Sequence, residues 1–260
     1  MNRYNEIRAI SYQRHLVPLM MENSAHVFIE SLSSIKANSI MDIACGTGVL
    51  TNLLANNFPK ARIVGTDISE DMLALARKQS QNTNVAFKLL DAHMLKEVEK
   101  FDLITCQYGY MFFEDYTVFL RRAKASLKPH GKLVFSTWDS LEKNNFFYEI
   151  CSKISQLTQT EFLSALSVPF ECNRPEEIVN DVLQCFNNCT YKIVQISLGK
   201  MSFEDVVSGF VDGNVLFQDI EQNNPNGFKL LKRICAKYLA EKFSSYWQSE
   251  KALAIQFEAS

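Results

Sequence analysis

The sequence lacks any long hydrophobic run and any excess of positive charge. No apolar stretch approaches the roughly 20 residues that a membrane-spanning helix needs, and the first residues contain no apolar core like that of a signal peptide. The formal net charge is −2, so no basic excess is available to hold nucleic-acid phosphates. We therefore expect a cytoplasmic globular protein without a membrane span or nucleic-acid partner, acting on a small or carrier-bound molecule.

The sequence also lacks a Cys-x-x-Cys pair, although it contains 7 cysteines. Cys185 and Cys189 are the closest two, and no histidine lies near them in the sequence, which argues against a metal site. Cys45 and Cys106 fall in or beside predicted buried strands, where a free thiol packs as a small apolar side chain. The pattern predicts reduced cysteines and no bound metal.

The chain of 260 residues, 47% of them hydrophobic, can fill one elaborated domain. Short apolar runs alternate with amphipathic segments between residues 40 and 138. The runs predict strands from Ile40, over Ala61–Asp67, Val85–Leu90, Phe101–Gln107 and Lys132–Thr137. Helices are predicted over Val49–Asn57, from the N-cap Ser69 to about Ser80, and over Asp115–Leu127. This alternation is typical of a parallel, doubly wound sheet.

Beyond Trp138 the strand and helix alternation becomes looser. Helices are predicted over Phe146–Leu157, Glu161–Leu166, Pro175–Phe186, Phe203–Asp212 and Phe228–Trp247, and strands over Tyr191–Leu198 and Ala252–Phe257. The predicted fold is a single α/β domain. It has a Rossmann-like, seven-stranded, mostly parallel sheet with an antiparallel last strand, and it carries helical cap insertions. Residues 1–38 are expected to form a helical lid, 39–138 the ligand-binding core, and 139–190 and 199–250 the cap.

The stretch from Ile40 to Leu50 joins a short apolar run, a turn with two glycines and the start of a helix. Gly46 and Gly48 allow a sharp turn and the close approach of a ligand, and the free N–H groups of the next helix face an anion. A dinucleotide-binding turn usually has a third Gly or Ala where this chain has Thr51. The turn therefore predicts a ligand site and argues against nicotinamide or flavin.

Asp42, Ala44, Gly46 and Gly48 resemble the acidic-x-Gly-x-Gly-x-Gly signature of class I S-adenosylmethionine-dependent methyltransferases, with Ala44 replacing the first glycine. Three further stretches in the family's order also resemble it: residues 65–73, 101–115 and 127–133. His130 departs from the usual Leu-Lys-Pro-Gly-Gly turn in the last of these. The resemblance covers residues 40–138. Within the family, the chain is similar to the ubiquinone/menaquinone-biosynthesis-like branch, whose members methylate small molecules.

The resemblance implies how S-adenosylmethionine is held. Asp67, 19 residues after Gly48, would accept hydrogen bonds from the ribose hydroxyls, and Asp91 would bind the adenine amino group. The cofactor carboxylate would face the Ala44–Gly48 turn. The cofactor set so predicted is Asp42, Ala44, Cys45, Gly46, Gly48, Asp67, Ile68, Met72, Asp91, Ala92, Gln107 and Tyr108. Turn or capping roles for the two aspartates, and helix-core packing for Met72, remain open alternatives.

An acceptor pocket is expected where the fourth and fifth strands end. Its predicted walls are Tyr108, Tyr110, Met111, Phe112 and Trp138, although such an aromatic cluster also suits a core. A sulfonium methyl is already activated, so a base is needed only for an acceptor that holds its proton tightly. His15 and Tyr12 are the candidate bases, because N-terminal helices of this family often cover the cofactor.

These observations predict an enzyme that passes a methyl group from S-adenosylmethionine to a small, partly apolar acceptor and releases S-adenosylhomocysteine. The acceptor atom, oxygen, nitrogen or carbon, stays open. Two other classes of protein remain as alternatives, a nucleotide-dependent oxidoreductase and a non-catalytic S-adenosylmethionine-binding protein.

Overall fold

The computed structural model describes residues 6–158, 166–212, 217–243 and 250–260. Seven strands form one sheet in the order β3-β2-β1-β4-β5-β7-β6. Their bounds are β1 Ser39–Ile43, β2 Arg62–Asp67, β3 Val85–Leu89, β4 Phe101–Gln107, β5 Leu127–Trp138, β6 Cys189–Ser197 and β7 Lys251–Ala259. β7 runs antiparallel to both of its neighbours, while the other described pairs are parallel. The predicted Rossmann-like sheet with an antiparallel last strand is confirmed.

The strand β5 begins earlier than the sequence predicts, at Leu127 instead of Lys132. Leu127 pairs with Phe101, and the register then shifts so that Leu103 pairs with Lys132. The Pro129-His130-Gly131 turn is therefore a bulge within the strand, and His130 takes a positive φ of 68° there. The turn was predicted, but the pairing of Leu127 on its far side depends on the neighbouring strand.

The helices that follow the first, second and fourth strands begin where the sequence predicts. They are α3 Val49–Asn57, α4 Glu70–Gln79 and α5 Tyr116–Ser126. The Ser69 side chain accepts a hydrogen bond from the Met72 N–H, and the Asp115 side chain accepts one from the Val118 N–H. Both residues are therefore N-caps, which satisfy an otherwise unpaired N–H of the first helical turn.

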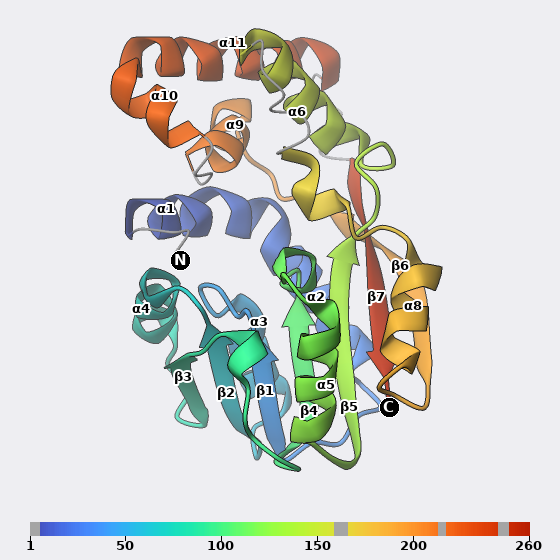
Figure 1. The fold of residues 1–260 in the computed structure, drawn as a ribbon. Helices are drawn as coiled ribbons and strands as arrows, with labels where there is room; N and C mark the ends of the chain where they lie inside the picture. Colours follow the sequence, from blue (N-terminus) through green and yellow to red (C-terminus); the bar gives the residue numbers. More distant parts are fainter. Residues whose placement is uncertain (1–5, 159–165, 213–216, 244–249) are drawn as a thin grey trace.

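The N-terminal segment consists of α1 Glu6–Ser11, a wide π-helical stretch η1 Tyr12–Met21, and α2 Glu22–Ser31. Pro18 lies inside η1, where it donates no backbone hydrogen bond. In Figure 1 the first part of this segment lies between the carboxyl ends of the strands and the helices above them. Ala25 and Phe28 of α2 are buried in the core against the sheet, so the expectation that residues 1–38 form a lid throughout is wrong for α2.

The helices α6 Asn145–Thr158, α9 Phe203–Val211, α10 Gln218–Asn223 and α11 Pro225–Phe243 gather above the sheet (Figure 1). The helix α8 Pro175–Leu183 does not join this cap. Ile178 and Val182 instead share a core with α5 and the sheet, so the expectation that 139–190 forms cap throughout is wrong for α8. The predicted helix Glu161–Leu166 lies largely outside the described residues, as do 244–249 of the predicted last helix.

Three apolar clusters hold these layers together. One fills the cap, a second lies between the sheet, α5 and α8, and a third lies between the sheet, α2 and α3. Among the described helices, none combines the length and apolar character required to cross a bilayer.

Candidate active site

The turn after β1 has the backbone conformation that its small residues permit. Ala44, Gly46 and Gly48 all have positive φ, at 55°, 55° and 83°. A Cβ on Gly48 would lie 3.1 Å from the Phe87 ring, so the turn packs tightly against β3. Since non-glycine residues seldom adopt positive φ, Ala44 holds a strained conformation of the kind found at binding sites.

Asp67, at the end of β2, is bonded directly to this turn. One carboxylate oxygen accepts a hydrogen bond from the Gly46 N–H at 2.8 Å, and the other accepts one from the Ser69 N–H at 2.9 Å. Burial raises the pKa of Asp67, and these backbone hydrogen bonds oppose the rise. The structure thus brings together the two motifs that the sequence separates by about twenty residues.

Asp42 lies beneath the turn and is almost fully buried. Its two carboxylate oxygens accept hydrogen bonds from the hydroxyls of Thr51, at 2.6 Å, and Thr105, at 2.8 Å. Burial raises the pKa of Asp42 to about 6, and the two hydroxyls act in the opposite direction. At neutral pH the group is therefore a carboxylate in an enclosed site.

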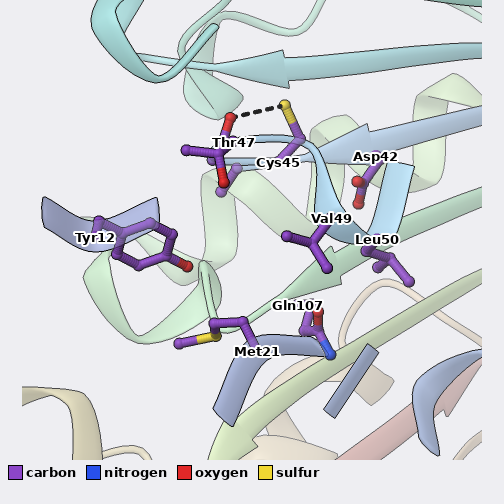
Figure 2. Close-up of a pocket in the computed structure, with 10 residues that line it drawn as sticks. Tyr12, Met21, Asp42, Cys45, Thr47, Val49, Leu50 and Gln107 are labelled. Carbon is purple, nitrogen blue, oxygen red and sulfur yellow. Dashed lines mark hydrogen bonds between the residues drawn. The ribbon is translucent and has the colours of Figure 1, made fainter. Parts of the chain in front are cut away.

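A pocket opens at this turn (Figure 2). Its described lining residues are Tyr12, Met21, Asp42, Ala44, Cys45, Gly46, Thr47, Val49, Leu50 and Gln107. Figure 2 shows Tyr12 and Met21 reaching the pocket from the N-terminal segment. A Cβ on Gly46 would lie 4.0 Å from the Tyr12 ring. The N-terminal segment thus covers the turn.

Asp91 lies at the end of β3, as the sequence predicts. Its carboxylate accepts hydrogen bonds from the His93 N–H and ring Nδ1, both at 2.9 Å, and caps the short helix η2 Ala92–Met94. Burial acts to raise its pKa, but the bonds from His93 outweigh this and lower it. Of the neighbouring residues, Ile68 is 52% exposed, whereas Met72 and Ala92 are buried in packing.

Tyr108 and Trp138 lie together at the ends of β4 and β5. Their rings are stacked 3.9 Å apart, and the Tyr108 hydroxyl contacts the Ser24 hydroxyl. Gln107, which lines the pocket, donates a hydrogen bond to the same Ser24 oxygen at 3.2 Å. A positive φ of 55° at Tyr108 turns the chain away from the strand direction.

The five predicted acceptor residues do not line the described pocket. Tyr110–Phe112 form the short 3₁₀ helix η3, in which successive side chains point in three directions instead of alternating between two. Tyr110 is fully buried against Phe135, Met111 joins the cap core, and Phe112 is 43% exposed. The expectation that all three share one pocket wall is therefore wrong, and Tyr110 is a core residue.

His15 is not among the described residues that line the pocket and contacts α9 instead. Its Nδ1 is 3.5 Å from an Asp205 oxygen, and a Cβ on Gly209 would lie 3.0 Å from the His15 Cβ. Burial lowers the pKa of His15, although Asp205 opposes this. Of the two candidate bases, the structure places only Tyr12 at the pocket.

The sequence prediction missed Thr51 and Thr105, which bond Asp42, and also Met21, Ser24 and Thr47. Thr51 had a signal, because it lies in the first turn of the helix that follows the glycine turn and so faces the strand. Ser24 had none, since its contact with Tyr108 joins residues 84 apart in the chain.

The pocket residues fit the amino-acid end of S-adenosylmethionine. Asp42 is a buried carboxylate with no ion pair among the described residues, and the buried Thr47 hydroxyl has no described partner. A ligand with an ammonium and a carboxylate group complements this pair, and Asp67 lies at the turn to receive ribose hydroxyls. The strand order and this turn define the class I methyltransferase fold.

Comparison with known proteins agrees with the fold. A family model described as a methyltransferase domain matches residues 35–192, so the chain belongs to that methyltransferase family. It is a class I S-adenosylmethionine-dependent methyltransferase. The predicted family, activity and cofactor are thereby confirmed, and the two alternative classes are not favoured.

The chain is similar in sequence to two O-methyltransferases. The chain is 29% identical over 198 residues to malonyl-[acyl-carrier protein] O-methyltransferase of Priestia megaterium, covering 74% of this chain and 71% of that one. It is 32% identical over 124 residues to ubiquinone biosynthesis O-methyltransferase of Coxiella burnetii, covering 46% and 52%.

A solved structure of phosphoethanolamine N-methyltransferase 2 from Haemonchus contortus, in complex with S-adenosyl-L-methionine, has a TM-score of 0.56 at 18% identity. The match covers 91% of this chain and 52% of that one, so the chain spans about half the length of the nematode protein. At this identity the likeness concerns the fold.

Proposed function

We propose that the chain methylates an oxygen atom of a small, partly apolar acceptor. The observation that supports oxygen is that two relatives, which differ in acceptor, are both named O-methyltransferases. The apolar part is supported by the aromatic cap above the ends of β4 and β5, where Trp138 packs near Phe147 and Phe170. The acceptor would lie near Gln107, the pocket residue that directly precedes Tyr108.

The chain's residues would act mainly by binding and orientation. S-adenosylmethionine, when bound, supplies an activated methyl group. Asp67 would hold the ribose, the Ala44–Gly48 turn the amino-acid end, and Asp91 with Ile68 the adenine. Tyr12 and Met21 would exclude water from above. Alignment of two reactants in this way can contribute roughly 7–11 kcal/mol to lowering a barrier.

We infer that the acceptor oxygen arrives ionised, as in a carboxylate or an acidic phenol, because no histidine is among the described residues that line the pocket. Burial raises the pKa of Tyr108, so its phenol stays protonated at neutral pH. His15 faces α9 instead of the pocket. An already ionised oxygen needs no base, whereas an alcohol would need one, a step worth on the order of 10²–10⁴-fold in rate.

We also place the reaction in the cytoplasm, with no nucleic-acid partner. All seven cysteines are free thiols in the structure, which is typical of a reducing compartment. Cys106 is buried and Cys45 half-buried around the glycine turn, and desolvation raises the pKa of both thiols. A stable neutral thiol is a packing group there and not a nucleophile.

The variant Asp67→Ala tests the assignment of the cofactor site. It removes the carboxylate expected to bind the ribose and leaves the Gly46 N–H without its partner. We expect calorimetric titration to show that the affinity for S-adenosylhomocysteine falls at least about 10–100-fold. Asp71→Ala, in the first turn of α4, is the control and should bind normally. Unchanged binding by Asp67→Ala, or binding of NADH in place of S-adenosylhomocysteine, would contradict the proposal.

A further inference from the structure

Asp42 carries a negative charge that the described protein does not neutralise. Only 1% of the residue is exposed, and no described lysine, arginine or histidine lies within ion-pair distance of its carboxylate. A buried charge without a partner is costly. Since Asp42 lines the pocket, a cationic group of the ligand is the partner that this arrangement lacks.

Thr51 and Thr105 approach this carboxylate from two different elements. Thr105 pairs with Asp42 in the register between β1 and β4, so both side chains lie on the same face of the sheet. Thr51 lies in the first turn of α3, which packs on that face. Each hydroxyl donates to a different oxygen, at 2.6 Å and 2.8 Å, which fixes both the position and the rotation of the carboxylate.

We propose that Thr51 and Thr105 are positioning residues for the cofactor, because they hold Asp42 as an oriented carboxylate that receives the α-amino group of S-adenosylmethionine. The inference rests on the proposed cofactor site and adds two residues outside the predicted set. Neither threonine lies among the described residues that line the pocket, so each acts through Asp42.

The surroundings of Asp42 make the two hydroxyls necessary at neutral pH. Asp67 on β2 is the charged group that acts on it, and it raises the pKa of Asp42 further. Cys45 in the turn and Cys106 on β4 are neutral thiols, because burial raises the pKa of each. The hydroxyls are the groups that oppose protonation, so the loss of one would move the protonation of Asp42 to higher pH.

The test is calorimetric titration between about pH 5.5 and 8.5 of the wild type, Thr51→Val and Thr51→Ser. S-adenosylhomocysteine carries the α-amino group, and 5′-methylthioadenosine lacks the amino-acid part. We expect Thr51→Val to bind S-adenosylhomocysteine about tenfold more weakly at pH 7, with its low-pH loss of affinity displaced upward. Thr51→Ser should restore both, and 5′-methylthioadenosine should bind all three proteins equally.

Thr66→Val is the matched control. Thr66 is equally buried and donates to the backbone oxygen of Asp42 at 3.3 Å, not to its carboxylate, so its pH profile should match the wild type. Thr105→Val removes the hydrogen bond to the other carboxylate oxygen of Asp42. It therefore tests the inference independently if Thr51→Val fails to fold.

An unchanged affinity and pH profile in Thr51→Val and Thr105→Val would overturn the inference, as would an equal loss for 5′-methylthioadenosine. If the wild type bound neither ligand, the proposed cofactor site itself would be contradicted, and the inference with it. The two failures are therefore distinguishable.

Discussion

The carboxyl edge of the sheet and the cap above it are held together by different kinds of contact. At the edge, directional hydrogen bonds join Asp67 to Gly46 and Asp42 to Thr51 and Thr105. In the cap, Phe147 packs among aromatic rings at centroid distances of 5.5–6.0 Å. Hydrogen bonds require particular residues at particular places, whereas an apolar cluster tolerates exchange of its members if volume is kept. The edge therefore carries sequence motifs and the cap carries none.

The N-terminal segment contacts both regions. Tyr12 faces the glycine turn, while His15 contacts α9 of the cap. The Gly199 N–H donates to the Leu19 carbonyl at 2.7 Å, and a Cβ on Gly199 would lie 1.9 Å from the Pro18 oxygen. The backbones approach closely here, so the segment and the cap insertion are expected to respond together when either is altered.

The largest expected effect comes from a cavity in the cap. Phe147→Ala removes a fully buried ring and should lower the free energy of unfolding by about 3–5 kcal/mol. Affinity for S-adenosylhomocysteine should change little, because the ring contacts the cap and not the turn. Denaturant unfolding and calorimetry check the two quantities.

Phe119→Ala is the matched comparison, since Phe119 is equally buried but lies between α5 and the sheet. We expect Phe119→Ala to lower the free energy of unfolding by a similar amount and, unlike Phe147→Ala, also to weaken the binding of S-adenosylhomocysteine. If Phe147→Ala weakened cofactor binding as much as Phe119→Ala, the distinction between the two regions would be lost.

A smaller effect on the free energy of unfolding is expected at Asp42, on the carboxyl edge of the sheet. Its buried charge destabilises the ligand-free protein but is expected to bind the ligand. The rise of the Asp42 pKa from 3.8 to about 6 corresponds to roughly 3 kcal/mol of destabilisation at pH 7. Asp42→Asn should raise the free energy of unfolding of the ligand-free protein by up to that amount. It should also weaken the binding of S-adenosylhomocysteine.

The sign follows from linkage. The folded protein holds the proton more tightly than the unfolded chain, so the Asp42 contribution to stability falls as pH rises from about 4 to 6. The advantage of Asp42→Asn over the wild type should therefore shrink as pH falls from 7 to 4. An advantage independent of pH in denaturant unfolding would contradict this account.

The smallest effect is expected at the two candidate bases. If the acceptor oxygen arrives ionised, Tyr12→Phe and His15→Gln should each have a kcat within about twofold of the wild type, measured with an identified acceptor. A loss of about 100-fold in Tyr12→Phe alone would identify Tyr12 as a general base instead. His15→Gln should also change stability by less than about 1 kcal/mol, because its Asp205 partner is half exposed.

The sequence by itself determined the order of strands and helices, the helix N-cap Ser69, and the glycine turn that marks the family. These features depend on local hydrophobic period, capping and backbone freedom, which neighbouring residues specify. Tertiary structure decided the rest. The pairing of Leu127 across a bulge, the three directions of η3, the burial of Tyr110 and the hydroxyls around Asp42 all arise from contacts between distant segments, and no local pattern encodes which distant partner a side chain meets.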